Sequence, residues 1–138
     1  MKLLPYLSFN GNCAQAIAFY EKVFGVKAES CTWGDMPKFD PNAVVPTGKE
    51  KWIMHASMKV FDGFDLQLSD CDEMGKTTGT NVCLQLTYKT AEQCKAVYKA
   101  LSAGAKILCA LAPAFYAPMY GELIDKFGIR WSVMQESK

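Results

Sequence analysis

The feature that most constrains the fold of this chain is an internal repeat. When its second half is laid over its first half, similar residues coincide: Leu7 with Leu86, Ser8 with Thr87, Phe9 with Tyr88, Phe19 with Tyr98, Gly25 with Gly104 and Lys27 with Lys106. Self-similarity of this kind indicates that one structural unit occurs twice. We therefore expect two copies of one small unit rather than a single continuous architecture.

Both halves contain the same order of secondary-structure patterns. Each half begins with a strand pattern, at Leu3–Phe9 and Asn81–Tyr88, and continues with a helix pattern, at Cys13–Phe24 and Ala91–Ala103. Apolar residues recur every three or four positions in both helices, and a glycine follows each one as a C-cap. Three strand-like segments come after each helix: Lys27–Trp33, Trp52–Val60 and Phe64–Ser69, then Lys106–Leu111, Met119–Asp125 and Ile129–Gln135.

The order βαβββ, repeated, predicts an α+β fold. A chain of 138 residues has the length of one domain. We expect one domain of two modules, at about residues 1–72 and about residues 78–138. The segment Asp35–Glu50, with Pro37, Pro41 and Pro46, shows no periodicity and is interpreted as a long mobile loop.

The hairpin turns predict which side chains share a face of each sheet. A three-residue loop at Phe61–Gly63, with Gly63 left-handed, places apolar residues opposite one another: Val60 and Phe64, Met58 and Leu66, Ala56 and Leu68. The other face then pairs Ser57 with Gln67. The second hairpin places Leu123 opposite Trp131, Glu122 opposite Ser132 and Ile124 opposite Arg130. Each sheet would have an apolar face for its helix and a polar face, and the two polar faces would surround a shared cleft.

Composition excludes several classes of partner. The formal net charge of +1 gives no basic patch for nucleic acid. No apolar run is long enough to span a bilayer, and the first residues make a poor signal peptide. The six cysteines include no C-x-x-C spacing, so we expect reduced cysteines and a cytoplasmic protein without nucleic-acid or membrane partners.

The repeated pattern resembles the vicinal oxygen chelate superfamily, which includes glyoxalase I, bleomycin-resistance proteins and extradiol dioxygenases, and within it the PhnB-like branch. The segments that carry the resemblance are Pro5–Gly25, Ile53–Gly63, Leu66–Asp70 and Met119–Trp131. The resemblance implies a cupped, eight-stranded mixed sheet around a small-molecule site, and a homodimer. The chain has no Gly-rich strand-to-helix turn for an adenosyl cofactor, and we expect no cofactor.

Metal-using members of this superfamily take ligands from four strands, two in each half. Carried over to this chain, these positions fall at Pro5 or Tyr6, at Gln67, among Asn81, Cys83 and Gln85, and at Ser132. Proline has no donor, and neutral serine, asparagine and glutamine are weak ligands for zinc, nickel or iron. We therefore expect no metal at this site.

The candidate site residues lie on the expected polar faces. Two interpretations of His55 are open: a general base or hydrogen-bond partner beside Ser57 and Gln67, or a histidine satisfied by a strand-end carbonyl or by the Asp35–Glu50 loop. The remaining candidates for substrate binding are Tyr6, Phe115, Tyr116, Tyr120, Glu122, Arg130 and Ser132. Glu122 and Arg130 could instead form an exposed ion pair, and the aromatic residues could pack in a dimer interface or the core.

Three functions are compatible with this site. The first is a small-molecule binding protein, or a metal-independent enzyme in which His55 transfers a proton. The second is a binding protein of the bleomycin-resistance type that sequesters an antibiotic, for which Asp65 and Glu122 would supply acidity. The third, which has the least support, is a metal-dependent lyase or dioxygenase.

Overall fold

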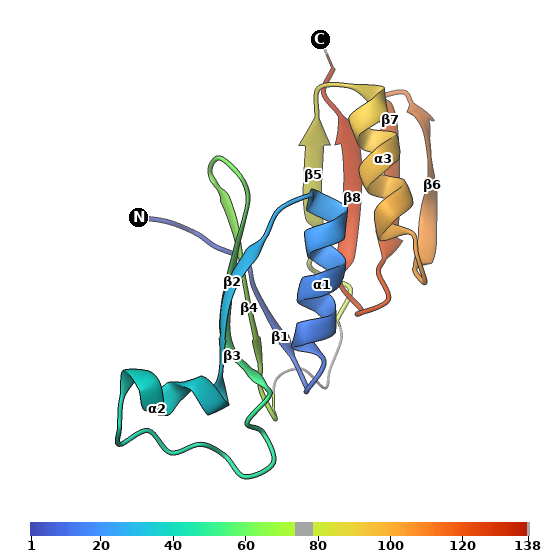
Figure 1. Ribbon diagram of the computed structural model, residues 1–138. Coiled ribbons are helices and arrows are strands. Elements are labelled where there is room, and N and C mark those ends of the chain that lie inside the picture. The colour runs from blue at the N-terminus through green and yellow to red at the C-terminus, as the bar shows by residue number, and fades with distance from the viewer. Residues whose placement is uncertain (74–78, 138) are drawn as a thin grey trace. The chain divides into compact units, whose positions relative to one another are not determined.

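The computed structural model describes residues 1–73 and 79–137. The chain divides into two compact units, residues 1–77 and residues 78–138 (Figure 1). No helix among the described residues is long and apolar enough to cross a membrane. That both units form one domain stays a prediction.

The first unit contains a four-stranded mixed sheet in the order β1-β4-β3-β2. Strand β1 pairs with β4 in parallel, and the other pairs are antiparallel. Helix α1 contacts β3 and β4. The elements are β1 (Tyr6–Phe9), α1 (Cys13–Phe24), β2 (Ala28–Thr32), η1 (Trp33–Asp35), α2 (Met36–Phe39), β3 (Ile53–Phe61) and β4 (Phe64–Asp70).

The second unit repeats this topology with the strand order β5-β8-β7-β6 (Figure 1). Strands β5 and β8 are parallel, the other pairs are antiparallel, and α3 contacts β5, β7 and β8. The elements are β5 (Leu84–Tyr88), α3 (Ala91–Leu101), β6 (Lys106–Ala114), β7 (Ala117–Ile124) and β8 (Arg130–Gln135). The two units therefore have equivalent sheets, which confirms the predicted α+β fold of two βαβββ modules.

The two helices end differently, although a glycine follows each. Gly25 caps α1 in the left-handed conformation with φ of 67°, as predicted. Helix α3 begins with a capping box between Thr90 and Gln93 and ends at Leu101, with Ser102 as its C-cap. The prediction that α3 continues to Ala103 is wrong, because a turn follows Leu101, in which the Ala105 amide donates to the Ser102 carbonyl at 3.1 Å and Gly104 has φ of 74°.

The predicted registers are largely confirmed. Ala56, Ser57 and Met58 pair with Leu68, Gln67 and Leu66, and Gly63 has φ of 86°. The prediction fails at the end of the first hairpin, where Phe61 rather than Val60 pairs with Phe64, because a register shift lies between Lys59 and Phe61. In the second hairpin all three predicted pairs are present: Leu123 with Trp131, Glu122 with Ser132 and Ile124 with Arg130.

Two segments differ from the sequence prediction. The sequence predicts a loop throughout the segment Asp35–Glu50, and this prediction is wrong at its start. Asp35 is the last residue of η1, and α2 follows it directly. The Asp35 carboxylate accepts hydrogen bonds from the amide and the hydroxyl of Thr32, which precedes η1. The β6–β7 hairpin is longer than expected, and only Phe115 and Tyr116 separate its strands. Register shifts along β6 accommodate Pro113 in an edge strand.

The core follows the apolar faces of the sheets and helices. Tyr20 of α1 and Trp131 of β8 are fully buried, as expected for core residues. All six cysteines are free, and Cys13 and Cys94 are buried, whereas Cys109 is exposed. The buried apolar side chains thus come from each helix and from its sheet, and the opposite face of each sheet carries the polar side chains described next.

Candidate functional site

The first unit has a polar face formed by Tyr6, His55, Ser57 and Gln67, called the first polar face below. Gln67 on β4 lies opposite Tyr6 on β1 and opposite Ser57 on β3, so the sheet register places three of these side chains in one row. The ring of Tyr6 lies 6.3 Å from the ring of His55, measured between centroids. The structure thus brings Tyr6 beside His55, Ser57 and Gln67, which the predicted register already placed together.

Hydrogen bonds join three of these side chains into a chain. Gln67 Nε2 donates to Ser57 Oγ at 2.9 Å, so Gln67 Oε1 faces His55 Nε2 at 2.8 Å. An amide oxygen only accepts, and His55 Nε2 must therefore carry the proton. In the neutral ring, Nδ1 is then the acceptor. His55 therefore has one ring nitrogen that can accept a hydrogen bond or a proton from a ligand.

A cavity of about 220 Å³ lies beside His55, lined by Glu29, Ser30, Cys31, His55 and Ser57. Cys31 lies opposite His55, and Glu29 lies opposite Ser57, in the β2–β3 register. Sequence reasoning missed Cys31 and Glu29. The two strands are separated by the long segment after Thr32, so no short turn fixed their register, and a further shift lies between Cys31 and Thr32.

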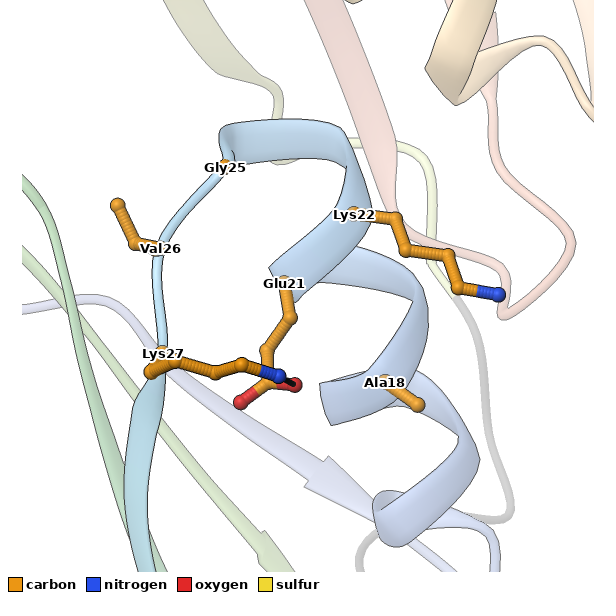
Figure 2. A pocket seen from close by; sticks show the side chains of 6 residues that line it. All are labelled: Ala18, Glu21, Lys22, Gly25, Val26 and Lys27. Carbon is orange, nitrogen blue, oxygen red and sulfur yellow. Dashed lines mark hydrogen bonds and ion pairs between the residues drawn. The ribbon is translucent and has the colours of Figure 1, made fainter.

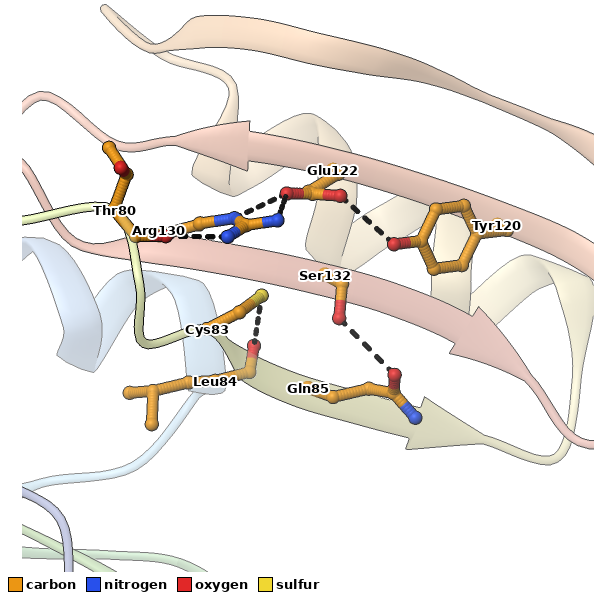
Figure 3. A network of polar contacts seen from close by, with 8 residues as sticks. All are labelled: Thr80, Cys83, Leu84, Gln85, Tyr120, Glu122, Arg130 and Ser132. Atoms are coloured by element: carbon orange, nitrogen blue, oxygen red, sulfur yellow. Dashed lines mark hydrogen bonds and ion pairs between the residues drawn. The ribbon is translucent and has the colours of Figure 1, made fainter.

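The second unit has an equivalent polar face, formed by Gln85, Tyr120, Glu122, Arg130 and Ser132 and called the second polar face. Ser132 on β8 lies opposite Gln85 on β5 and Glu122 on β7, as Gln67 does relative to β1 and β3. Ser132 Oγ lies 3.5 Å from Gln85 Oε1 (Figure 3). Gln85 thus joins the predicted residues at the position that Tyr6 has in the first unit.

A charged network occupies most of the second polar face (Figure 3). Arg130 pairs with Glu122 through Nε and Nη2, and Arg130 Nη1 donates to the Thr80 carbonyl. The Tyr120 hydroxyl donates to Glu122 Oε2 at 3.0 Å. The hydrogen bond from Arg130 lowers the pKa of Glu122, while burial, and then the bond to Glu122, raises the pKa of Tyr120 to about 12. The Arg130 fork is therefore engaged within the protein.

The predicted aromatic residues form a row at the β6–β7 turn. The ring centroids of Tyr116 and Tyr120 lie 5.4 Å apart, and those of Phe115 and Tyr116 lie 4.9 Å apart. Phe115 is fully exposed and Tyr116 is half-exposed. These rings are not packed in the core of the second unit, so of the three interpretations the core is excluded, and a ligand wall or an interface between copies stays a prediction.

A larger depression, of about 400 Å³, lies at the end of α1 and is lined by Ala18, Glu21, Lys22, Gly25, Val26 and Lys27 (Figure 2). Two of its charged groups pair with each other: Lys27 Nζ lies 2.8 Å from Glu21 Oε2, and Glu21 Oε1 accepts from the Ala28 amide. These bonds lower the pKa of Glu21 and fasten the chain after the helix. The depression therefore has a structural explanation.

The residues at the superfamily metal positions do not fit a transition metal. Tyr6, Gln67, Gln85 and Ser132 offer neutral oxygen or nitrogen donors, and Gln67 already bonds to His55 and Ser57. Across the described ranges, no three His, Cys, Asp or Glu side chains group together in a way that could hold a metal ion.

No family model matches the chain. Among curated proteins, Protein YjdN from Escherichia coli (strain K12) is 34% identical over 139 residues, covering 96% of this chain and 94% of that protein. Among solved structures, protein PA1353 from Pseudomonas aeruginosa is 28% identical with a TM-score of 0.84, covering 100% of this chain and 99% of that one.

Two further structures share the fold. A PhnB protein from Bacillus cereus has a TM-score of 0.77 at 24% identity, over 99% of this chain and 100% of that chain. A glyoxalase/bleomycin resistance protein/dioxygenase family enzyme from Burkholderia phytofirmans has a TM-score of 0.61 at 17% identity, over 94% and 95% of the two chains. The fold of this chain is thus shared, over almost its whole length, with these proteins.

Proposed function

Because the chain belongs to the PhnB-like branch of the vicinal oxygen chelate superfamily, we propose that it binds a small molecule on its polar faces without the metal site of the superfamily's metal-using members. The observation that carries the proposal is the hydrogen-bonded chain His55–Gln67–Ser57 beside a cavity of about 220 Å³. Ligand sites are concave and carry a few convergent polar groups that orient the bound molecule, and a cavity of this volume suits a small ligand.

The first polar face has the hydrogen-bonding capacity for a ligand that bears oxygen atoms. His55 Nδ1 can accept a proton, the Ser57 hydroxyl can donate, and Gln67 Nε2 has a second hydrogen beyond the one directed at Ser57. The bond to Gln67 holds the imidazole ring in place, and the Tyr6 ring supplies an apolar wall. If the bound molecule is turned over, His55 is the residue that takes the proton.

Native mass spectrometry of the protein purified with minimal washing tests the binding proposal. We expect wild-type protein to retain a small molecule, and Gln67→Ala to lose it, because both neighbours of Gln67 lose their partner. Thr47→Ala, in the exposed loop, is the control and should retain the molecule. Equal retention by Gln67→Ala, or a wild type that neither retains a molecule nor gains thermal stability from any member of a panel of small organic acids and ketones, would overturn the proposal.

The role of His55 has a separate test. His55→Gln keeps a side chain that can donate to Gln67 but cannot transfer a proton. If the retained molecule is a substrate, this variant should bind it and fail to convert it. Conversion at the wild-type rate would exclude His55 as the base.

The antibiotic-sequestering alternative gains no support from the acidic residues on which it depends. Glu122 is paired with Arg130, and Asp65 is paired with Lys2 at 3.1 Å. A cationic drug would have to displace these partners. We therefore retain the binding of a neutral or oxygen-bearing molecule as the proposed function.

We also propose that the protein is a homodimer in the cytoplasm. Strand β6 is an edge strand whose side chains Ile107 and Leu108 are 46% and 44% exposed, and the exposed Phe115 follows it. A second copy would cover these apolar side chains. Light scattering should give twice the chain mass for the wild type and the monomer mass for Leu108→Lys.

The proposed cytoplasmic location is supported by the free cysteines, which are consistent with a reducing compartment.

A further inference from the structure

A third cavity in the first unit, of about 240 Å³, is lined by residues that differ from those of the cavity beside His55 and of the depression at the end of α1. They are Trp33, Pro46, Lys49, Trp52, Asp70, Cys71 and Asp72. None of them was singled out by the sequence reasoning. Two indole rings, an ammonium group and a carboxylate therefore meet where the long segment after η1 returns to the sheet.

Backbone hydrogen bonds hold the segment around Trp33 next to the segment around Trp52. The Trp33 amide donates to the Trp52 carbonyl at 3.0 Å, and the Gly34 amide donates to the Glu50 carbonyl at 2.8 Å. A Cβ atom at Gly34 would lie 2.9 Å from that same carbonyl oxygen, so this close approach requires glycine. The aromatic walls are therefore part of the fold of this unit.

Hydrogen bonds also hold the backbone on the acidic side of the cavity, at Cys71 and Asp72. Asn10 Nδ2 donates to the carbonyls of Cys71 and Asp72 at 3.2 Å and 3.1 Å, and the Cys71 amide donates to the Phe9 carbonyl at 2.7 Å. These bonds fix the backbone that carries the Asp72 carboxylate. A negative charge thus has a defined position next to the indoles.

Lys49 fills this arrangement from within the chain. Its ammonium lies 4.7 Å from the centroid of the Trp52 ring and is paired with Asp72. A turn from Pro46 to Lys49 places it there: the Lys49 amide donates to the Pro46 carbonyl, and Gly48 takes φ of 76°. An aromatic face together with a carboxylate is the combination by which proteins recognise organic ammonium ions.

We propose that this cavity is a binding site for small organic ammonium ions, with the ammonium of Lys49 as its intramolecular occupant. An external cation would displace Lys49 and take its place between Trp52 and Asp72. The displacement has a low energetic cost, because the Lys49 and Asp72 side chains are 26% and 51% exposed, and an ion pair that is open to solvent contributes little to stability. The cavity is below the ~300 Å³ of drug-sized sites, which limits the ligand to a small cation.

Titration with tetramethylammonium chloride, followed by tryptophan fluorescence, tests this proposal. Trp33 and Trp52 report on the cavity, whereas Trp131 is fully buried in the other unit. We expect saturable binding by Lys49→Met with a Kd up to about fivefold below that of the wild type, since removal of the internal competitor frees the site. Lys38→Met is the matched control, because Lys38 pairs with Asp35 on the same segment, and it should behave as wild type.

Two further measurements test whether Asp72 holds the cation and whether the cation displaces Lys49. The double variant Lys49→Met/Asp72→Asn should lose the binding gained by the single variant. In the wild type, tetramethylammonium should raise the rate at which an acetylating reagent modifies Lys49, with Lys38 unchanged, as read by peptide mass spectrometry. The proposal is overturned if Lys49→Met responds to tetramethylammonium no differently from sodium chloride at equal ionic strength, or if acetylation of Lys49 is unaffected.

Discussion

The carboxylate of Asp70, at the end of β4, accepts a hydrogen bond of 3.0 Å from the amide of Cys13, the first residue of α1. The same Oδ1 atom accepts from the Gly11 amide at 2.7 Å, and Oδ2 accepts from the Ile53 amide at 2.9 Å. Asn12, the N-cap of α1, makes no capping bond with its own side chain. A strand residue thus caps the helix and fixes the start of β3.

Asp70→Ala should destabilise the protein strongly. The substitution removes the partner of three amide groups in a buried region, and buried donors without partners are costly, so we expect a loss of about 3 kcal/mol or more in the free energy of unfolding. Urea denaturation followed by circular dichroism measures this. Asp62→Asn, fully exposed in the first hairpin, is the control and should change stability by less than about 0.5 kcal/mol.

Tyr120 should titrate well above an ordinary tyrosine. Its folded-state pKa is raised to about 12 by burial and by the hydrogen bond to Glu122, and its unfolded pKa is about 10. The neutral phenol therefore stabilises the fold below about pH 10, and this contribution is lost as the pH rises through 12. Ring-labelled NMR, with Tyr120→Phe for assignment, measures the pKa directly.

Replacing Glu122 should lower the pKa of Tyr120, but not as far as the value of about 10 found for an ordinary tyrosine. In Glu122→Gln the negative charge disappears, but burial, the largest cause of the shift, remains. We expect a Tyr120 pKa between about 10 and 12. A value unchanged from the wild type would mean that the carboxylate has no influence on the phenol.

Gly121→Ala should be destabilising for steric reasons. A Cβ atom at this buried position of β7 would lie 2.7 Å from Tyr98 Cε2 and 2.9 Å from Leu111 Cα. We expect a loss of about 1–3 kcal/mol, because a packed interior accommodates an added methyl group poorly. Thermal unfolding measures it, and Gly79→Ala, at an exposed position, should leave the melting temperature unchanged.

The cysteines should differ in reactivity toward a thiol-alkylating reagent. Burial, and then the charge of Asp70, raises the pKa of the Cys13 thiol to about 12, and burial also raises the pKa of Cys94. Cys109 is exposed. At neutral pH, peptide mapping should find Cys109 modified first and Cys13 and Cys94 unmodified until denaturant is added. Modification of Cys13 in the folded protein would contradict its burial.

The polar faces show how far a register can be predicted. Gly63 and Gly128 both adopt positive φ in short hairpin loops, and such loops fix which residues lie opposite one another. For that reason the pairing of Ser57 with Gln67 and of Glu122 with Ser132 was predictable. Cys31 was not, because a long segment rather than a tight turn joins β2 to β3.

The long segment itself marks the limit of sequence periodicity. Its prolines indicated a loop, yet Asp35 and Thr32 form a capping box that starts a short helix. Of the residues that line the cavity proposed to bind ammonium ions, Lys49 lies on this segment, Trp52 follows it and Asp72 follows β4, so their positions have no common spacing. The backbone hydrogen bond from Trp33 to Trp52 and the hydrogen bond from the Asn10 side chain to the Cys71 carbonyl help to bring them together.

By itself, the sequence determined the repeated βαβββ order, the apolar face of each sheet and the positions of His55, Gln67 and Ser132 on the opposite faces, because strand alternation and helix periodicity are local properties of the chain. The tertiary structure alone decided that His55 donates to Gln67, that Glu122 binds Arg130 and that Asp70 caps a distant helix. These contacts join residues whose distance depends on how strands cross and twist, and no local pattern encodes that distance.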